Sequence, residues 1–245
     1  MAFHYMKNNK PNIVAMIPAR SGSQRLKNKN LALIANKPLI YYAINAAKKS
    51  KAFNKISINS DNNMYKNISL RYKVDFYKRS KYLGGSNIKS DDIVYDFILK
   101  NPCDIIVWVN PIAPLQTSKD INDCISYFHK NKLNTLITTV EKKVHYTFNK
   151  KPINFKLKGK FSRTQDLMPL QEMVYSIMMW KTKSFIRNMK KNKSAILHGK
   201  IGYFNIPFLS SIIIKYEGDL LIAENILKTK NKKNYRIKYD RILRK

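Results

Sequence analysis

The sequence is poor in the residues that build disulfide frameworks and metal sites. Only two of its 245 residues are cysteines and four are histidines. Neither cysteine has a cysteine or histidine partner at metal-site spacing, and the histidines form no cluster. We therefore expect Cys103 and Cys124 to be core thiols.

Long apolar runs are also absent. No segment approaches the roughly 18 uninterrupted apolar residues of a membrane-spanning helix, and residues 1–12 lack the apolar core of a signal peptide. We expect a cytoplasmic protein without a membrane partner. The hydrophobic content of 44% excludes a disordered chain, and the length predicts one domain over residues 1–245.

Acidic residues are scarce. The chain has 15 aspartates and glutamates but 47 lysines and arginines, which gives a net charge of +32. Such a charge is typical of nucleic-acid binding. The lysines are nevertheless spread over almost every segment among asparagines and isoleucines, as an AT-rich genome would produce. No helix-turn-helix, zinc-finger or RNA-binding motif accompanies them. We expect no specific nucleic-acid partner, only nonspecific polyanion binding at low salt.

The most informative stretch is residues 13–30, where an apolar run changes abruptly into a cationic loop. Residues 13–18 fit a strand buried on both faces, which Pro18 ends. In the loop, Gly22 lets backbone N–H groups approach a phosphate, and flanking serine hydroxyls add hydrogen bonds. The loop is neither a Walker loop nor a dinucleotide fingerprint, because the required lysine and glycines are missing. The predicted phosphate contacts of the loop are Ser21, Gly22 and Ser23, with countercharge from Arg20, Arg25, Lys27 and Lys29, and Ala19 is expected to contact the nucleotide beside them.

Strand and helix patterns alternate along the chain, which predicts an α/β fold with a mostly parallel, doubly wound sheet. An apolar segment covers 174–180, a polar excursion covers 141–165, and a basic tail covers 228–245. Ser118 is the expected helix N-cap, and Ser60 and Asp61 are expected at the ligand-binding carboxyl edge of the sheet. Strands are predicted at 13–18, 55–61, 74–77, 105–109, 135–140 and 203–206, and helices at 38–51, 62–72, 90–99, 118–128, 181–193 and 219–227.

The spacing Ile-Pro-Ala-Arg-Ser-Gly-Ser-x-Arg-x-x-x-Lys-Asn over residues 17–30 resembles the signature loop of the acylneuraminate cytidylyltransferases (CMP-sialic acid synthetases) and of their relatives that act on other nonulosonic acids. The resemblance covers roughly residues 12–228. It implies a three-layer fold like that of nucleotide-diphospho-sugar transferases, and a reaction of CTP with a sugar acid that gives a CMP-sugar and pyrophosphate for surface glycans. It also implies Mg²⁺ as cofactor and a homodimer formed through the excursion.

The same resemblance assigns roles to individual residues. Arg20 would contact the triphosphate and Lys29 would stabilise the reacting phosphate, which makes them the catalytic pair. Arg163 would approach the carboxylate of the sugar acid, for which a bidentate arginine is the natural partner. Further nucleotide contacts are implied for Asn30, Ser60, Asp61, Arg79, Ser90 and Asn110, and further sugar contacts for Gln116, Gln165 and Tyr175.

Three departures from the family pattern leave alternatives open. The metal-binding Asp-Ile-Asp is replaced by Ile213-Ile214-Lys215, which cannot hold Mg²⁺ through carboxylates. In a first explanation, substrate phosphates hold the metal together with another carboxylate, Asp61 or Asp219. In a second, the Lys215 ammonium replaces part of the charge of the metal. In a third, the chain is a noncatalytic or re-purposed sugar-nucleotide-binding relative. Val174-Tyr175 stands where the family has Asn-Gly, so Tyr175 either packs on the sugar or belongs to the core. Gln116 replaces an arginine, and another sugar or nucleotide substrate remains an alternative.

Overall fold

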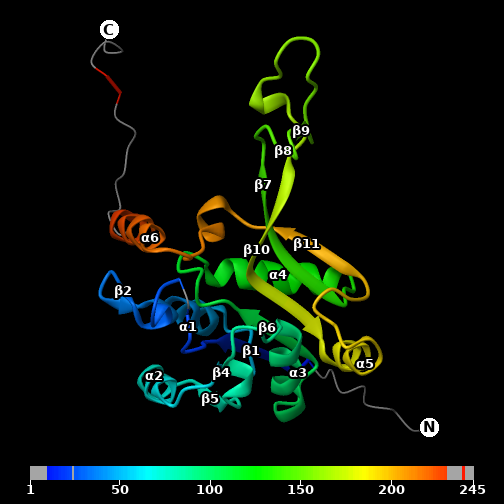
Figure 1. Ribbon diagram of the computed structural model, residues 1–245. Coiled ribbons are helices and arrows are strands. Elements are labelled where there is room, and N and C mark those ends of the chain that lie inside the picture. Colours follow the sequence, from blue (N-terminus) through cyan, green and yellow to red (C-terminus); the bar gives the residue numbers. More distant parts are fainter. Residues whose placement is uncertain (1–9, 24, 231–238, 241–245) are drawn as a thin grey trace, which may run out of the picture.

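The computed structural model describes residues 10–23, 25–230 and 239–240. Its centre is a seven-stranded sheet in the order β11-β7-β10-β6-β1-β4-β5 (Figure 1). Every paired neighbour is parallel except that β10 runs antiparallel to both β6 and β7. The predicted mostly parallel sheet is confirmed. The strands are β1 (Ile13–Pro18), β4 (Lys55–Ser60), β5 (Asp75–Lys78), β6 (Ile105–Val109), β7 (Thr135–Lys142), β10 (Leu170–Lys181) and β11 (Ile201–Asn205).

Helices cover both faces of this sheet and make it a three-layer structure. Residues of α1, α2 and α4 pack in one apolar cluster with the sheet, and residues of α3 and α5 pack in a second cluster. The last helix, α6 (Glu217–Lys230), packs beside the short hairpin of β2 (Leu33–Ile34) and β3 (Lys37–Pro38). The other helices are α1 (Leu39–Ser50), α2 (Met64–Tyr72), α3 (Ser90–Lys100), α4 (Ser118–Lys130) and α5 (Thr182–Asn192).

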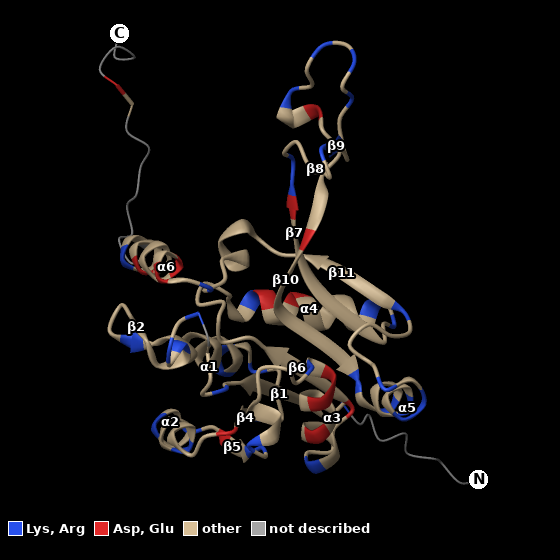
Figure 2. Ribbon diagram, viewed as in Figure 1, with Lys and Arg blue, Asp and Glu red and all other residues tan. Residues whose placement is uncertain are grey.

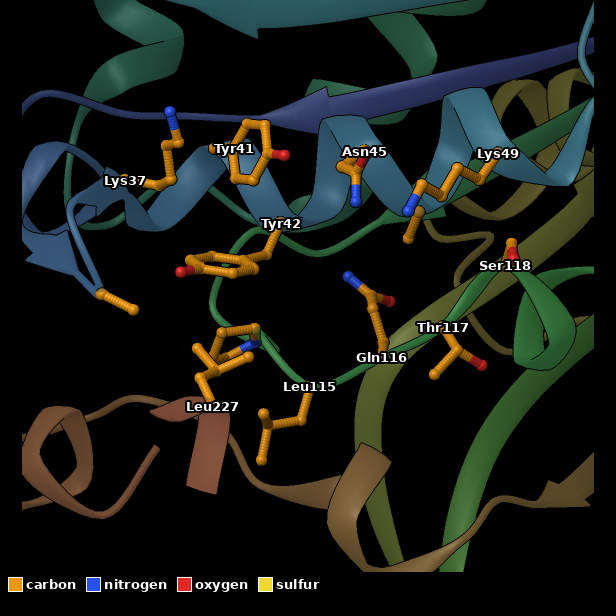
Figure 3. A pocket seen from close by; sticks show the side chains of 13 residues that line it. Lys37, Tyr41, Tyr42, Asn45, Lys49, Leu115, Gln116, Thr117, Ser118 and Leu227 are labelled. Atoms are coloured by element: carbon orange, nitrogen blue, oxygen red, sulfur yellow. The ribbon is translucent and has the colours of Figure 1, made fainter. Parts of the chain in front are cut away.

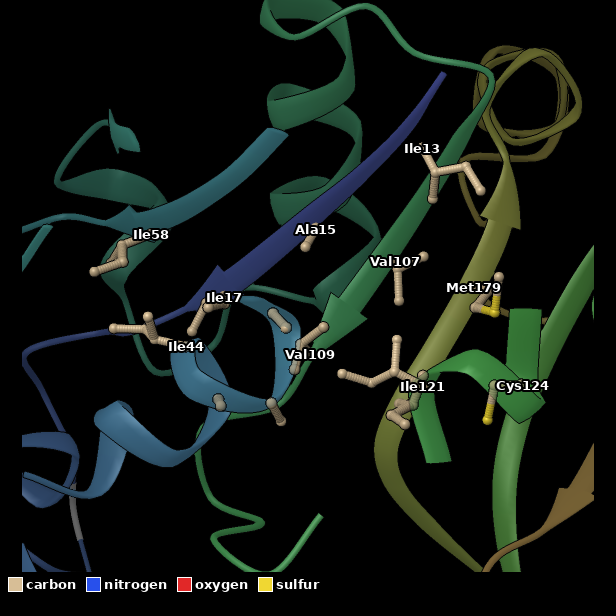
Figure 4. Packing of buried hydrophobic residues seen from close by; sticks show 14 of the residues in the cluster. Ile13, Ala15, Ile17, Ile44, Ile58, Val107, Val109, Ile121, Cys124 and Met179 are labelled. Carbon is tan, nitrogen blue, oxygen red and sulfur yellow. The ribbon is translucent and has the colours of Figure 1, made fainter. Parts of the chain in front are cut away.

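Strand β1 lies at the centre of the core, as its unbroken apolar sequence predicts. Ile13, Ala15 and Ile17 belong to the cluster under α1 and α4 (Figure 4), whereas Val14 and Met16 belong to the cluster under α3 and α5. Because successive side chains of a strand point to opposite faces, a strand covered on both sides needs apolar residues at every position. This burial fixes where the strand ends and the cationic loop begins.

The segment between β7 and β10, which contains β8 (Thr147–Phe148) and β9 (Lys151–Pro152), projects from the body of the protein (Figure 1). The His145 ring stacks on Phe161 with centroids 4.3 Å apart. In Figure 2, lysines and arginines appear on all the labelled helices and on this excursion, whereas the central strands β1 and β6 have none. Among the described residues, no helix has the length and apolarity needed to cross a membrane.

Several details differ from the sequence predictions. The hairpin of β2 and β3 and the full length of β10 were not predicted, and most of the expected basic tail lies outside the described residues. The prediction of Ser118 as N-cap of α4 is wrong. Thr117 is the N-cap, and it forms a capping box in which its hydroxyl accepts from the Asp120 amide while the Asp120 carboxylate accepts from the Thr117 amide. Asp120 is buried and also accepts from the Ser210 hydroxyl, so the box joins α4 to the chain before α6.

We therefore expect Thr117→Ala to lower the free energy of unfolding by about 1–2 kcal/mol, because it removes the cap and one partner of a buried carboxylate. Ser118→Ala is the matched control, and it should change stability by less than about 0.5 kcal/mol. Urea unfolding of the two variants measures both values. Equal losses in the two variants would contradict the assignment of Thr117 as the cap.

Candidate active site

The parallel strands β4, β1 and β6 end at one edge of the sheet, and so does β5 beside them. The residues that leave them include Arg20, Asp61, Arg79 and Asn110. A pocket of about 240 Å³ opens at this edge. Its lining contains seven of the predicted ligands, Arg20, Ser23, Lys29, Asn30, Arg79, Ser90 and Asn110, and adds Pro18, Leu83, Gly85, Ile88, Ile93, Trp108, Pro111 and Ile112.

Asp61 is the carboxylate that organises this edge. It accepts hydrogen bonds from the amide of Ser21 (3.1 Å) and from its hydroxyl (2.6 Å), and it lies 3.6 Å from the Arg79 guanidinium. Burial opposes its ionisation, but the Ser21 hydrogen bonds and the Arg79 charge hold the pKa of Asp61 below the ordinary value. A Cβ at Gly84 would lie 2.6 Å from the Asp61 carboxyl carbon, so this position requires glycine. Asp61 thus connects the loop after β1 to Arg79.

Not all predicted loop residues face the pocket. Both donors of Ser21 go to Asp61, which makes Ser21 a structural residue of the loop. Ala19 is buried, and Arg25 lies over the Tyr216 ring at 5.8 Å. Gly22 is exposed, and Ser60 is buried and accepts a hydrogen bond from the Asn62 amide. None of Ala19, Ser21, Gly22, Arg25 and Ser60 lines the pocket.

The pocket wall contains buried polar atoms without a partner. Arg79 is only 2% exposed, yet its Nε and Nη1 have no hydrogen-bond acceptor among the described residues. Likewise Asn30 Oδ1 has no donor, and Trp108 Nε1 has no acceptor, among the described residues. Because buried polar groups are nearly always hydrogen-bonded, such a cluster indicates a site that a polar ligand completes. Sequence reasoning missed Trp108, since β6 is apolar at every position and offers no alternation to mark the residue that faces a ligand.

Lys29 supplies a second cation at the pocket. Its ammonium donates to the backbone oxygen of Ile214 at 2.9 Å. Burial, followed by the neighbouring charges of Arg25 and Arg20, lowers the pKa of Lys29, and Asp219 opposes this shift. No residue that lines the pocket is acidic. An anionic ligand would therefore relieve the repulsion among these cations.

The segment that replaces the expected metal-binding pair lies beside this site. The Ile214 amide donates to the Ile112 oxygen at 2.8 Å, and Ile112 lines the pocket. Ile213 packs against an apolar cluster with Val140, Val174 and Ile206, and Lys215 is exposed.

The described residues do not fit a preformed Mg²⁺ site. Asp61 is engaged by Ser21 and Arg79, and Asp219 accepts from the amides of Lys215 (2.7 Å) and Tyr216 (2.8 Å) at the start of α6. No three His, Cys, Asp or Glu side chains converge among the residues that the structure describes. A hard cation needs several free oxygen ligands, whereas Asp61 is engaged through both oxygens and Asp219 through Oδ2.

Gln116 lies in a different and larger cavity, of about 480 Å³, between α1 and the turn after β6 (Figure 3). Its Nε2 donates to the Asn110 oxygen at 2.8 Å, whereas its buried Oε1 has no partner among the described residues. No described residue of the 13–30 stretch lines this cavity. We assign the chemistry to the smaller pocket, because it gathers the cations and the unpaired polar atoms.

The residues predicted to bind the sugar are not brought together within the chain. Arg163 and Gln165 lie on the projecting excursion, where Arg163 forms a bidentate pair with Asp166 at 2.7 and 3.1 Å. Tyr175 does lie near the pocket, because the Asn110 amide group donates to its backbone oxygen at 3.1 Å. At 42% exposed, Tyr175 is not a core aromatic.

Comparison with known proteins agrees with this site. The profile of a family described as cytidylyltransferase matches residues 14–176, which is more than half of the chain. The chain belongs to the cytidylyltransferase family. The members of this family are nucleotidyltransferases, so the chain is of that enzyme class.

Two relatives of this cytidylyltransferase have informative names. Post-translational flagellin modification protein B of Campylobacter coli is 28% identical over 232 residues, covering 89% of this chain and 96% of that protein. The N-acylneuraminate cytidylyltransferase of Streptococcus agalactiae serotype III is 30% identical over 166 residues. That match covers 64% of this chain and 40% of the streptococcal protein, so the chain spans less than half of that relative.

Among solved structures, the CMP:2-keto-3-deoxy-manno-octonic acid synthetase complexed with CTP superposes with a TM-score of 0.67 over 89% of this chain and 99% of that chain. At 14% identity this likeness concerns the fold alone, and it confirms the predicted α/β class.

The role of Asp61 can be separated from metal binding. We expect Asp61→Asn to weaken CTP binding about tenfold, because it removes the charge that positions Ser21 and Arg79. The loss should be equal in EDTA and in Mg²⁺, as measured by titration calorimetry. Asp123→Asn, which alters an exposed pair with Lys119, is the control and should not change the affinity. A loss that appears only with Mg²⁺ would instead make Asp61 a metal ligand.

Proposed function

We propose that this cytidylyltransferase activates a nonulosonic, sialic-type sugar acid with CTP and releases a CMP-sugar and pyrophosphate. The observation that carries the proposal is the pocket at the carboxyl edge of β1, where Arg20, Lys29 and Arg79 meet and no carboxylate lines the wall. The names of the relatives from Campylobacter coli and Streptococcus agalactiae support the sugar-acid class and a role in surface glycans. We further propose that the enzyme works in the cytoplasm.

The pocket suits a cytidine nucleotide with its base toward Arg79 and its phosphates toward the loop. The unpaired donors of Arg79 and Trp108 match the O2 and N3 acceptors of cytosine. Arg20, Ser23 and Lys29 belong to the loop after β1, where their charges and hydroxyl can contact the phosphates. Ser90 is the first residue of α3, so the positive end of that helix dipole also faces the pocket.

In the proposed reaction the anomeric hydroxyl of the sugar acid attacks the α-phosphate. A bond forms between that oxygen and phosphorus, and the bond to the β-phosphate oxygen breaks in line, so that pyrophosphate leaves. Lys29 and Arg20 stabilise the charge that develops on the phosphates. Among the described residues, no histidine, aspartate or glutamate lines the pocket, so the hydroxyl proton passes to solvent or to a phosphate oxygen. No step depends on a protein-bound metal.

We also propose a homodimer formed through the excursion. Phe148, Leu157 and Met168 are 69%, 76% and 73% exposed there, which is typical of an interface. Phe148→Ser combined with Leu157→Ser should convert the dimer into a monomer in sedimentation velocity, because it removes apolar contact area. Leu70→Ser, at a 67% exposed position of α2, is the control and should remain dimeric. A wild-type chain that sediments as a monomer would refute the dimer.

A second candidate is a relative that binds sugar nucleotides without turnover. It is favoured by the replacement of the expected carboxylates by Ile213 and Lys215 and by the engagement of Asp219 with backbone amides. A change of sugar or of nucleotide is a variant of the first proposal. A thermal-shift series with the four nucleoside triphosphates identifies the nucleotide, because a ligand that binds the folded state raises the melting midpoint.

We expect Lys29→Ala to lower the rate of pyrophosphate release from CTP and a nonulosonic acid by about 10²–10³, as loss of one electrostatic stabiliser does. Lys27→Ala is the matched control, since Lys27 is exposed and does not line the pocket, and it should retain the wild-type rate. If the wild-type protein binds CTP but releases no pyrophosphate with any nonulosonic acid, in EDTA or Mg²⁺, the noncatalytic alternative holds.

A further inference from the structure

Tyr175 has a backbone conformation that a tyrosine rarely adopts. Its φ is +57°, in the left-handed region, where a bulky side chain is strained. The other described non-glycine residues with positive φ lie in turns or beside helix ends. Tyr175 is the one aromatic residue among them and the one inside a long strand. They are Asn28, Ala35, Asn36, Lys51, Lys73, Lys132, Asn149, Lys150 and Lys193.

The surrounding structure holds this conformation from both sides. The register of β10 against β7 shifts between Met173 and Met178, which marks a bulge. Before Tyr175, Val174 is 3% exposed in its apolar cluster, and after it Ser176 is fully buried, with its hydroxyl 3.1 Å from that of Thr138. Because both neighbours are buried, the Tyr175 side chain faces outward at the position of the bulge.

The bulge is also bonded to the nucleotide pocket. The backbone amide of Asn110 donates to the Ser176 oxygen at 2.9 Å, and its side-chain amide donates to the Tyr175 oxygen. Asn110, Pro111 and Ile112 line the pocket, so Tyr175 stands immediately outside that wall. Its hydroxyl donates to Met173 Sδ at 3.3 Å, which leaves the ring at the surface of this edge. A strained backbone conformation persists only where the surrounding contacts hold the residue in place, and residues strained in this way are concentrated at ligand sites.

We propose that Tyr175 is a specificity-determining wall of the second substrate's subsite, and that the strained bulge presents its ring to an apolar face of that substrate. The substrate class is an acid sugar that carries an apolar patch, either a C–H face or an acyl or methyl substituent. This inference rests on the proposed function. The backbone oxygen of Tyr175 is bonded to Asn110, and its ring does not line the nucleotide pocket, so we place the ring at the acceptor and not at the nucleotide.

The test compares Tyr175→Gly, Tyr175→Asn and Tyr175→Phe with the wild-type protein. Glycine and asparagine tolerate the left-handed conformation, so the melting midpoint should rise by about 2–4 °C. Both variants lose about 50 Å² of apolar contact, so the KM for the sugar acid should rise roughly eightfold. The KM for CTP should stay within about twofold. Tyr175→Phe should keep the wild-type KM, because it keeps the ring.

Tyr203 gives a matched control, since it is also 42% exposed but lies on the edge strand β11. Tyr203→Ala should leave both KM values unchanged. If Tyr175→Gly raises the midpoint but not the KM for the sugar acid, the strain has no part in recognition and the inference is overturned. If the wild-type protein itself turns over no sugar acid, the proposed function fails and this inference with it. The wild-type assay alone therefore distinguishes the two failures.

Discussion

The site depends on one partly buried carboxylate, that of Asp61. It follows β4 in the chain, but it fixes the loop after β1 through Ser21 and faces Arg79 after β5. A guanidinium that is 2% exposed is stable only with a negative partner, and the 3.6 Å separation leaves its other nitrogens free for a ligand. Gly84, in the loop after β5, also lies so close to the Asp61 carboxyl group that a Cβ at this position would clash with it. A single charge thus sets the positions of three loops that the parallel sheet brings to one edge.

Two departures from the family pattern are connected by packing. Ile213 stands where the resemblance implies a carboxylate, and Val174 stands where it implies an asparagine. In the structure both belong to the apolar cluster that also contains Val140 and Ile206. Burying a carboxylate among such residues would be costly without a cation, so each apolar exchange makes the other favourable. The two positions are therefore apolar together, and the charged groups that line the neighbouring pocket are positive.

Much of the architecture could be predicted from the sequence, because burial of β1 on both faces demands an apolar residue at every position. The position of the cationic loop was predictable as well, because the apolar run shows where β1 ends and the loop follows directly at that edge of the sheet. The choice of Thr117 over Ser118 was also visible, because only Thr117 has an acidic residue three positions later. The orientation of Gln116 into another cavity was not predictable, since it depends on how α1 packs against the turn after β6. The pairing of Arg163 with Asp166 is a local contact three residues apart, and the sequence prediction of a sugar-binding Arg163 did not consider it.

The conformation of Tyr175 follows from the direction of β10. The parallel strands β4, β1 and β6 reach the site at their carboxyl ends, whereas β10 is antiparallel to β6 and approaches the same edge with its first half. A regular strand would continue its alternation past Asn110 and turn every second side chain into the core. Val174 and Ser176 are buried and Tyr175 between them faces outward, as alternation gives, but the register shift between Met173 and Met178 places Tyr175 at a positive φ. Glycine would serve this geometry without strain, so a tyrosine here has to contribute through its side chain.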